Sequence, residues 1–242
     1  MDVWLIILIA YTLIYEPIIG YFEYKKFKVK VKLQSNARVS YYKKIIIGLW
    51  IPTIIILGLI VFSELTLKDV GLTLPSFQLE ILGAVPSYII IGLIGLYFLL
   101  MIYYLVGYHF SRQFRIKFSA QKQASMQKIS YIDIIPVTKE EKKWWNFVSI
   151  TAGVTEEIIY RGFLIFAFSY FFPSLSIWIV LLLSSFIFGL AHTYQGIGEG
   201  VIRTSIIGFI FSCFYVSVGS ILPLIILHII IDYVGKLGEE VN

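Results

Sequence analysis

The sequence has very little cysteine and little charge for its length. A single cysteine, Cys213, excludes an internal disulfide framework and a metal cluster built on cysteine ligands. Charged residues make up only 14% of the 242 residues, whereas hydrophobic residues make up 58%. Soluble domains have about 25% charged residues. The composition therefore excludes an ordinary water-soluble protein and indicates an integral membrane protein.

Seven long apolar runs alternate with polar or charged segments. A spanning helix needs about 20 apolar residues, and the hydrocarbon offers no partner for backbone groups outside a helix. The predicted spans are residues 3–22, 45–62, 81–108, a run that follows Trp144 and Trp145 and reaches about residue 171, then 176–192, 200–218 and 221–234. The sequence predicts an all-α, polytopic bundle of about seven transmembrane helices. Trp144 and Trp145 are expected to be interface anchors.

Basic residues are concentrated in two loops, which contain sixteen of the 20 Lys and Arg residues. They are Lys25, Lys26, Lys28, Lys30, Lys32, Arg38, Lys43 and Lys44, then Arg112, Arg115, Lys117, Lys122, Lys128, Lys139, Lys142 and Lys143. The positive-inside rule places both loops in the cytoplasm and segment 64–80, with Lys68 alone, outside. We therefore expect a multi-pass cell-membrane protein with its N-terminus outside and its C-terminus in the cytoplasm.

The same loops bear on possible partners. Topology and anionic lipid already explain juxtamembrane Lys and Arg, so no nucleic-acid partner is expected. The second loop, residues 111–143, has a pattern compatible with an amphipathic helix at the membrane interface.

Several ionisable residues lie inside the predicted spans. A charge at bilayer depth costs several kcal/mol unless it is paired or in a wet cavity, so such residues are functional candidates. Three predicted helices place these groups at a similar depth near the cytoplasmic side. They are Glu156, Glu157 and Arg161, then His192, and then His228 and Asp232. By contrast, we expect Glu16, near the inner end of the first span, to be interfacial and structural.

Helical spacing groups these candidates into pairs. Glu157 and Arg161 are four residues apart and can form an ion pair, which could serve only to hold helices together. Glu156 points about 100° away from Glu157 and has no local partner. His228 and Asp232 are also four residues apart, so one helix face offers an imidazole and a carboxyl group.

These groups are compatible with two hydrolytic mechanisms. Glu156 and an imidazole could activate water as a general base, while His228 stabilises the oxyanion. Asp232 could donate a hydrogen bond only when protonated, and could otherwise orient His228. Alternatively, Glu156, His192 and His228 could bind zinc, although no HExxH motif is present. A GxSxG motif is also absent, which argues against a serine nucleophile.

Three motifs in this part of the chain resemble those of the CPBP family of intramembrane proteases, which includes type II CAAX prenyl endopeptidases and Abi-like, bacteriocin-processing members. Glu156, Glu157 and Arg161 match EExxxR, Phe188 and His192 match FxxxH, and His228 and Asp232 match an HxxxN or HxxxD motif. The resemblance covers about the last 100 residues. The N-terminal half is similar only in hydropathy and in the weak DVGLTLP segment.

The resemblance implies a glutamate-type intramembrane protease, from a group formerly described as metalloproteases. Glu156 with His192 would activate water, and His228 with Asp232 would hold the oxyanion. Arg161 would pair with Glu157 and fix its helix. No cofactor would be required, with zinc as the alternative. This chain departs from the CAAX-processing members at Asp232, where they have Asn. An amide donates a hydrogen bond to an oxyanion, whereas an ionised carboxylate does not.

The resemblance also implies how the chain is divided and what it acts on. Residues 1–143 would hold the first three helices and both basic loops, and residues 144–242 the catalytic helices, within one membrane domain. The bilayer and a membrane-associated peptide or protein, with or without a lipid anchor, would be the partners, in CAAX-type or bacteriocin- or signal-peptide-like maturation. The alternatives are a noncatalytic bacteriocin-immunity or scaffold protein and, third, a proton-coupled transporter that uses Glu156.

Overall fold

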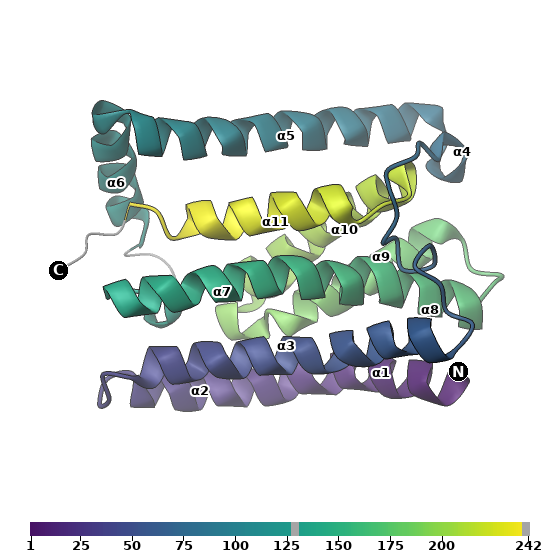
Figure 1. The fold of residues 1–242 in the computed structure, drawn as a ribbon, viewed down its shortest axis with the longest axis horizontal. Helices are drawn as coiled ribbons and strands as arrows, with labels where there is room; N and C mark the ends of the chain where they lie inside the picture. The colour runs from purple at the N-terminus through teal and green to yellow at the C-terminus, as the bar shows by residue number, and fades with distance from the viewer. Residues whose placement is uncertain (127–130, 239–242) are drawn as a thin grey trace.

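The computed structural model describes residues 1–126 and 131–238, and these residues form helices joined by turns, with no strand. The long helices lie side by side along one direction, and α6 crosses them at one end (Figure 1). The predicted all-α fold is therefore confirmed for the described residues. Lys128 of the second basic loop lies outside the described residues, and so do residues 239–242 at the end of the predicted C-terminal unit.

The N-terminal half contains three long helical rods. The first rod is continuous but contains a π-helical segment, η1, in its middle. The elements are α1 (Asp2–Ile14), η1 (Tyr15–Gly20), α2 (Tyr21–Lys30), α3 (Ala37–Phe62), α4 (Leu79–Leu82), α5 (Ala84–Phe110) and α6 (Arg112–Met126). Two of these helices extend past the predicted spans, because hydropathy detects only the apolar part of a helix. α3 therefore begins at Ala37 instead of residue 45, and the first rod ends at Lys30 instead of residue 22.

The C-terminal half contains shorter helices with two more π-helical segments. These elements are η2 (Ile132–Ile134), α7 (Lys139–Glu156), η3 (Glu157–Phe163), α8 (Leu164–Phe171), α9 (Ile177–Ala191), η4 (Thr193–Gln195), η5 (Ile197–Ile202), α10 (Arg203–Val218) and α11 (Leu222–Gly235). α7 packs against both α3 and α11, and α9 packs against α10. The predicted fourth span thus becomes one rod made of α7, η3 and α8.

Four helical rods among the described residues are long and apolar enough to cross a membrane. They are Asp2–Lys30, Ala37–Phe62, Ala84–Phe110 and Ile197–Val218. Ile177–Ala191 and Leu222–Gly235 are apolar but shorter. These features indicate a membrane protein, and the count of about seven spans stays a prediction.

Charge separates the two ends of the bundle. The turn between α2 and α3, α6 and the C-terminal end of α11 lie at one end, whereas α1 begins at the opposite end, where α4 also lies on the other side of the bundle (Figure 1). Both basic loops therefore belong to the same end. At the other end, the segment between α3 and α5 is tied to the start of α11, because Ile221 N donates to Gly71 O at 2.9 Å.

A capping box fixes the start of α7, outside the apolar part of the rod. Thr138 caps the helix, and Glu141 Oε2 accepts from the backbone N–H groups of Val137 and Thr138 at 2.8 and 2.9 Å. Arg38 Nη1 lies 3.5 Å from Glu141 Oε1. Burial raises the pKa of Glu141, but the hydrogen bonds from Thr138 and Val137 and the charge of Arg38 outweigh it and hold that pKa below its ordinary value.

We expect Glu141→Ala to lower the free energy of unfolding by about 1–2 kcal/mol, because it removes the capping acceptor. Since the folded-state pKa is lowered, this stabilisation is present above the ordinary pKa of a glutamate and is lost as the pH falls through the folded value. Unfolding by SDS titration at pH 7 and at pH 4 measures both effects. Glu140→Ala, at an exposed neighbouring position, is the control. Equal stability of the two variants at pH 7 would contradict the prediction.

Candidate active site

The motif residues Glu157 and Arg161 lie in the π-helical segment η3. In this segment Leu164 N–H bonds to Ile159 O, five residues back, instead of to Tyr160 O. The hydroxyl of Ser184 on α9 donates to Tyr160 O at 2.5 Å and so satisfies that carbonyl. π-helical turns are rare and are frequent at functional sites. The widened turn is thus held in place by a side chain from a neighbouring helix.

Glu157 and Arg161 form the ion pair predicted from their spacing. Arg161 Nη1 lies 3.2 Å from Glu157 Oε1, and the two side chains are 1% and 0% exposed. The guanidinium carbon of Arg161 also lies 4.1 Å from the ring centre of Phe188 and 5.4 Å from that of Phe211. Such contacts combine charge with stacking on an aromatic face. Phe188 of the second motif therefore contacts the arginine of the first.

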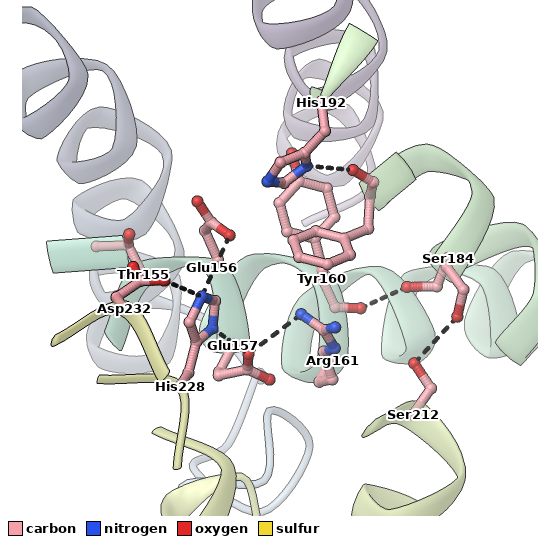
Figure 2. A network of polar contacts seen from close by, with 12 residues as sticks. Thr155, Glu156, Glu157, Tyr160, Arg161, Ser184, His192, Ser212, His228 and Asp232 are labelled. Atoms are coloured by element: carbon pink, nitrogen blue, oxygen red, sulfur yellow. Dashed lines mark hydrogen bonds and ion pairs between the residues drawn. The ribbon is translucent and has the colours of Figure 1, made fainter. Parts of the chain in front are cut away.

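His228 connects the motif on α11 to both glutamates. Its Nδ1 lies 2.7 Å from Glu157 Oε1, and its Nε2 lies 3.9 Å from Glu156 Oε2 and 4.0 Å from Asp232 Oδ1. Figure 2 shows the imidazole between the carboxyl groups, with Arg161 on the far side of Glu157. The structure thus brings the first and third motifs together. Spacing along the chain gave no sign of the contact between His228 and Glu157, which are 71 residues apart.

His192 is held by its own motif. Its Nδ1 lies 2.9 Å from Phe188 O, and the two rings meet edge to face at 4.8 Å between centres. A carbonyl oxygen can only accept a hydrogen bond, so Nδ1 carries the proton. In the neutral ring Nε2 is then an acceptor. The FxxxH spacing therefore fixes the tautomer of His192 and leaves Nε2 able to accept a proton or a hydrogen bond.

Glu156 and His192 both line two cavities. The larger, of about 360 Å³, is also lined by His228 and Asp232. The smaller, of about 60 Å³, is also lined by Glu16. Among the described residues no hydrogen bond joins Glu156 to His192. The Glu156 carboxylate is therefore near both imidazoles but available to a molecule in either cavity.

Two residues that were not among the predicted site residues also lie at the site. Glu16, expected to be an interfacial and structural residue, lies in the same cavity as Glu156 and His192. Trp145, predicted to be an interface anchor, also contacts the site, because its Nε1 donates to Asp232 O at 3.3 Å. Both side chains reach the site through packing between helices that are distant in the sequence, which hydropathy does not reveal.

The predicted zinc ligands do not form a prepared metal site. Within residues 1–126 and 131–238, no group of three or more His, Cys, Asp or Glu side chains is placed to hold a metal ion. His228 Nδ1 is already bound to Glu157, and His192 Nδ1 to Phe188. These two contacts leave Nε2 of each ring free, and the zinc alternative stays a prediction.

Comparison with known proteins identifies one family. Residues 141–234 match the family described as Type II CAAX prenyl endopeptidase Rce1-like. No curated protein and no solved structure matches the chain. The matched segment begins in α7 and ends in α11, so it contains every predicted site residue, while the helices before Glu141 lie outside it. The resemblance to CPBP proteases is thus confirmed across residues 141–234, which match the Rce1-like family of type II CAAX prenyl endopeptidases.

Proposed function

We propose that this protein is a glutamate-type intramembrane endopeptidase that cleaves a membrane-associated peptide or protein, with CAAX-type maturation as the favoured class. The family match supports a protease. The observation that carries the proposal is the position of Glu156, whose carboxylate shares a cavity with His192 and His228 and lies 3.9 Å from Nε2 of His228. A pure scaffold would have no need for an available carboxylate in a cavity between two imidazoles.

In the proposed reaction, a water molecule binds between Glu156 and Nε2 of His192. Glu156 takes a proton from that water as its oxygen attacks the carbonyl carbon of the scissile peptide bond. The resulting tetrahedral intermediate carries a negative oxygen. When it collapses, the C–N bond breaks and the proton on Glu156 passes to the departing nitrogen. The products are a new carboxyl group and a free amine.

His228 would stabilise the negative oxygen of the intermediate. Since Nδ1 is bound to Glu157, Nε2 is the ring atom that faces the cavity carboxylates. Nε2 donates a hydrogen bond only when the ring is doubly protonated. A prepositioned donor of this kind contributes a factor of about 10²–10³ in rate. Asp232, at 4.0 Å from Nε2, would orient the ring while ionised and could donate only when protonated.

The same proposal places the protein in a cell membrane. The four apolar rods, the rod made of α7, η3 and α8, and the two shorter apolar helices together would supply about seven spans. The N-terminus would lie outside and the C-terminus in the cytoplasm. The position of both basic loops at one end of the bundle supports this orientation (Figure 1). The site would then lie near the cytoplasmic side, where a substrate held by a lipid anchor could reach it.

Cleavage can be tested directly with the full chain in liposomes. The probe is a farnesylated peptide that ends in a CAAX sequence, compared with the same peptide without the farnesyl group. In water enriched in ¹⁸O, we expect a shortened product with one ¹⁸O atom in its new carboxyl group. Both peptides remaining intact, together with tight peptide binding, would favour the scaffold alternative. A pH-dependent ion flux without cleavage would favour the transporter.

Metal dependence separates the glutamate-type mechanism from the zinc alternative. We expect EDTA to change the cleavage rate by less than about twofold, because Glu156 itself accepts the proton. The measurement compares untreated protein, protein dialysed against EDTA and dialysed protein with added Zn²⁺. Loss of activity on dialysis and recovery with Zn²⁺ would show that a metal is required.

A further inference from the structure

A crevice between the first two helical rods leads to Glu156 through a cavity that His228 does not line. Its outer part is a cavity of about 290 Å³ between η1 and the start of α3, and its inner part is the cavity of about 60 Å³ beside His192. The two parts share four lining residues, and the inner part also touches Glu156. The shared residues are Glu16, Gly20, Tyr41 and Ile45.

Glu16 lies at the junction of the two parts. The carboxylate lies along its own helix, since a Cβ atom on Gly20 would be 3.3 Å from Glu16 Oε2. Thr193, next to His192, donates to Pro17 O at 3.2 Å and holds η1 against the site. This contact explains how a residue from the N-terminal rod comes to share a cavity with the motif residues.

At the outer end of the crevice, ion pairs compensate the charges. There, Lys44 Nζ lies 2.6 Å from Glu23 Oε2 and Lys26 Nζ lies 3.1 Å from Glu23 Oε1. Glu16 has no hydrogen bond or ion pair with any described residue. An uncompensated carboxyl group within a membrane-spanning rod is costly unless water solvates it.

The inner cavity has the size and polarity that water requires. A site must provide about 10–15 Å³ for each water, together with two to four polar partners. The cavity of about 60 Å³ has room for several waters and is lined by Glu16, Glu156, His192, Tyr160 and Tyr194. The substrate would instead bind in the larger cavity of about 360 Å³, which His228 also lines.

We propose that this crevice is a water channel, with Glu16 at its neck, that supplies Glu156 separately from the substrate cavity. The role of the channel rests on the proposed hydrolysis. The presence of water in the crevice does not, because it can be measured without any enzymatic activity. Its occupant is water, and a substrate segment would be the competing occupant.

Thiol labelling tests whether the crevice is wet. Ile18 and Ile19 are neighbours on η1 with similar exposure, 50% and 45%, but only Ile19 lines the crevice. In liposomes, we expect a membrane-impermeant, positively charged methanethiosulfonate to label Ile19→Cys at least 10-fold faster than Ile18→Cys. The unaltered chain gives the background from buried Cys213. Equal rates, or no labelling of Ile19→Cys, would overturn the channel.

Kinetics then identify what the channel carries. We expect Glu16→Leu, which places an apolar side chain in the neck, to lower kcat at least 10-fold with KM within twofold, and Glu16→Gln to retain most of kcat. A rise in KM with unchanged kcat would show a substrate passage instead, and no effect on either constant would also overturn the proposal. If the unaltered protein cleaves nothing, the proposed function fails, but the labelling result still decides whether the crevice is wet.

Discussion

Replacing Glu156 with Gln is expected to lower the rate at which the farnesylated peptide is cleaved by about 10²–10⁴-fold, which is the usual contribution of a general base. Gln has nearly the same shape as Glu but cannot accept the proton of the attacking water. Its side chain would still fit beside His228, whose Nε2 lies 3.9 Å from Glu156 Oε2. The effect should therefore appear in kcat, with little change in KM.

The control for this substitution is Glu64→Gln, at an exposed position just after α3. This variant should cleave the farnesylated peptide at the same rate as the unaltered protein. Mass spectrometry of the ¹⁸O-labelled product gives the rates, and SDS titration shows whether each variant is folded. A folded Glu156→Gln variant with more than a tenth of the normal rate would show that another group is the base.

The sequence was sufficient to predict the helical class and the local pairs. Apolar runs mark membrane helices because the hydrocarbon imposes helical structure. Glu157 and Arg161 could be paired from spacing because residues four apart lie on one face of a helix, and a π-helical segment still brings them to 3.2 Å. The motif between Phe188 and His192 also predicted a residue pair that the structure brings into contact.

Contacts between distant helices were beyond sequence reasoning. The bond between His228 and Glu157 depends on how α11 packs against α7. No periodicity within either helix specifies that packing. Glu16 was placed at the interface because it lies near the end of an apolar run, yet the rod continues as a helix to Lys30. Helix ends were misjudged where charged residues extend a helix beyond its apolar part.

Replacing Arg161 with Ala is expected to lower the free energy of unfolding by about 3–5 kcal/mol, because it leaves a buried carboxylate without its partner. Glu157 is 0% exposed, and among the described residues only His228 would remain to compensate it after the substitution. The guanidinium contacts with the rings of Phe188 and Phe211 would be lost as well. SDS titration measures the change, and Arg112→Ala, at an exposed position, is the control.

A double-variant cycle shows whether the charge pair causes this loss. Glu157→Gln removes the carboxylate charge, and Arg161→Met removes the guanidinium but keeps an apolar side chain of moderate length. If the buried pair is the cause, the double variant should be more stable than the sum of the single effects predicts, since neither charge is left alone. A simple sum of the two effects, or a loss below about 1 kcal/mol for Arg161→Ala, would show that packing and not charge holds η3 in place.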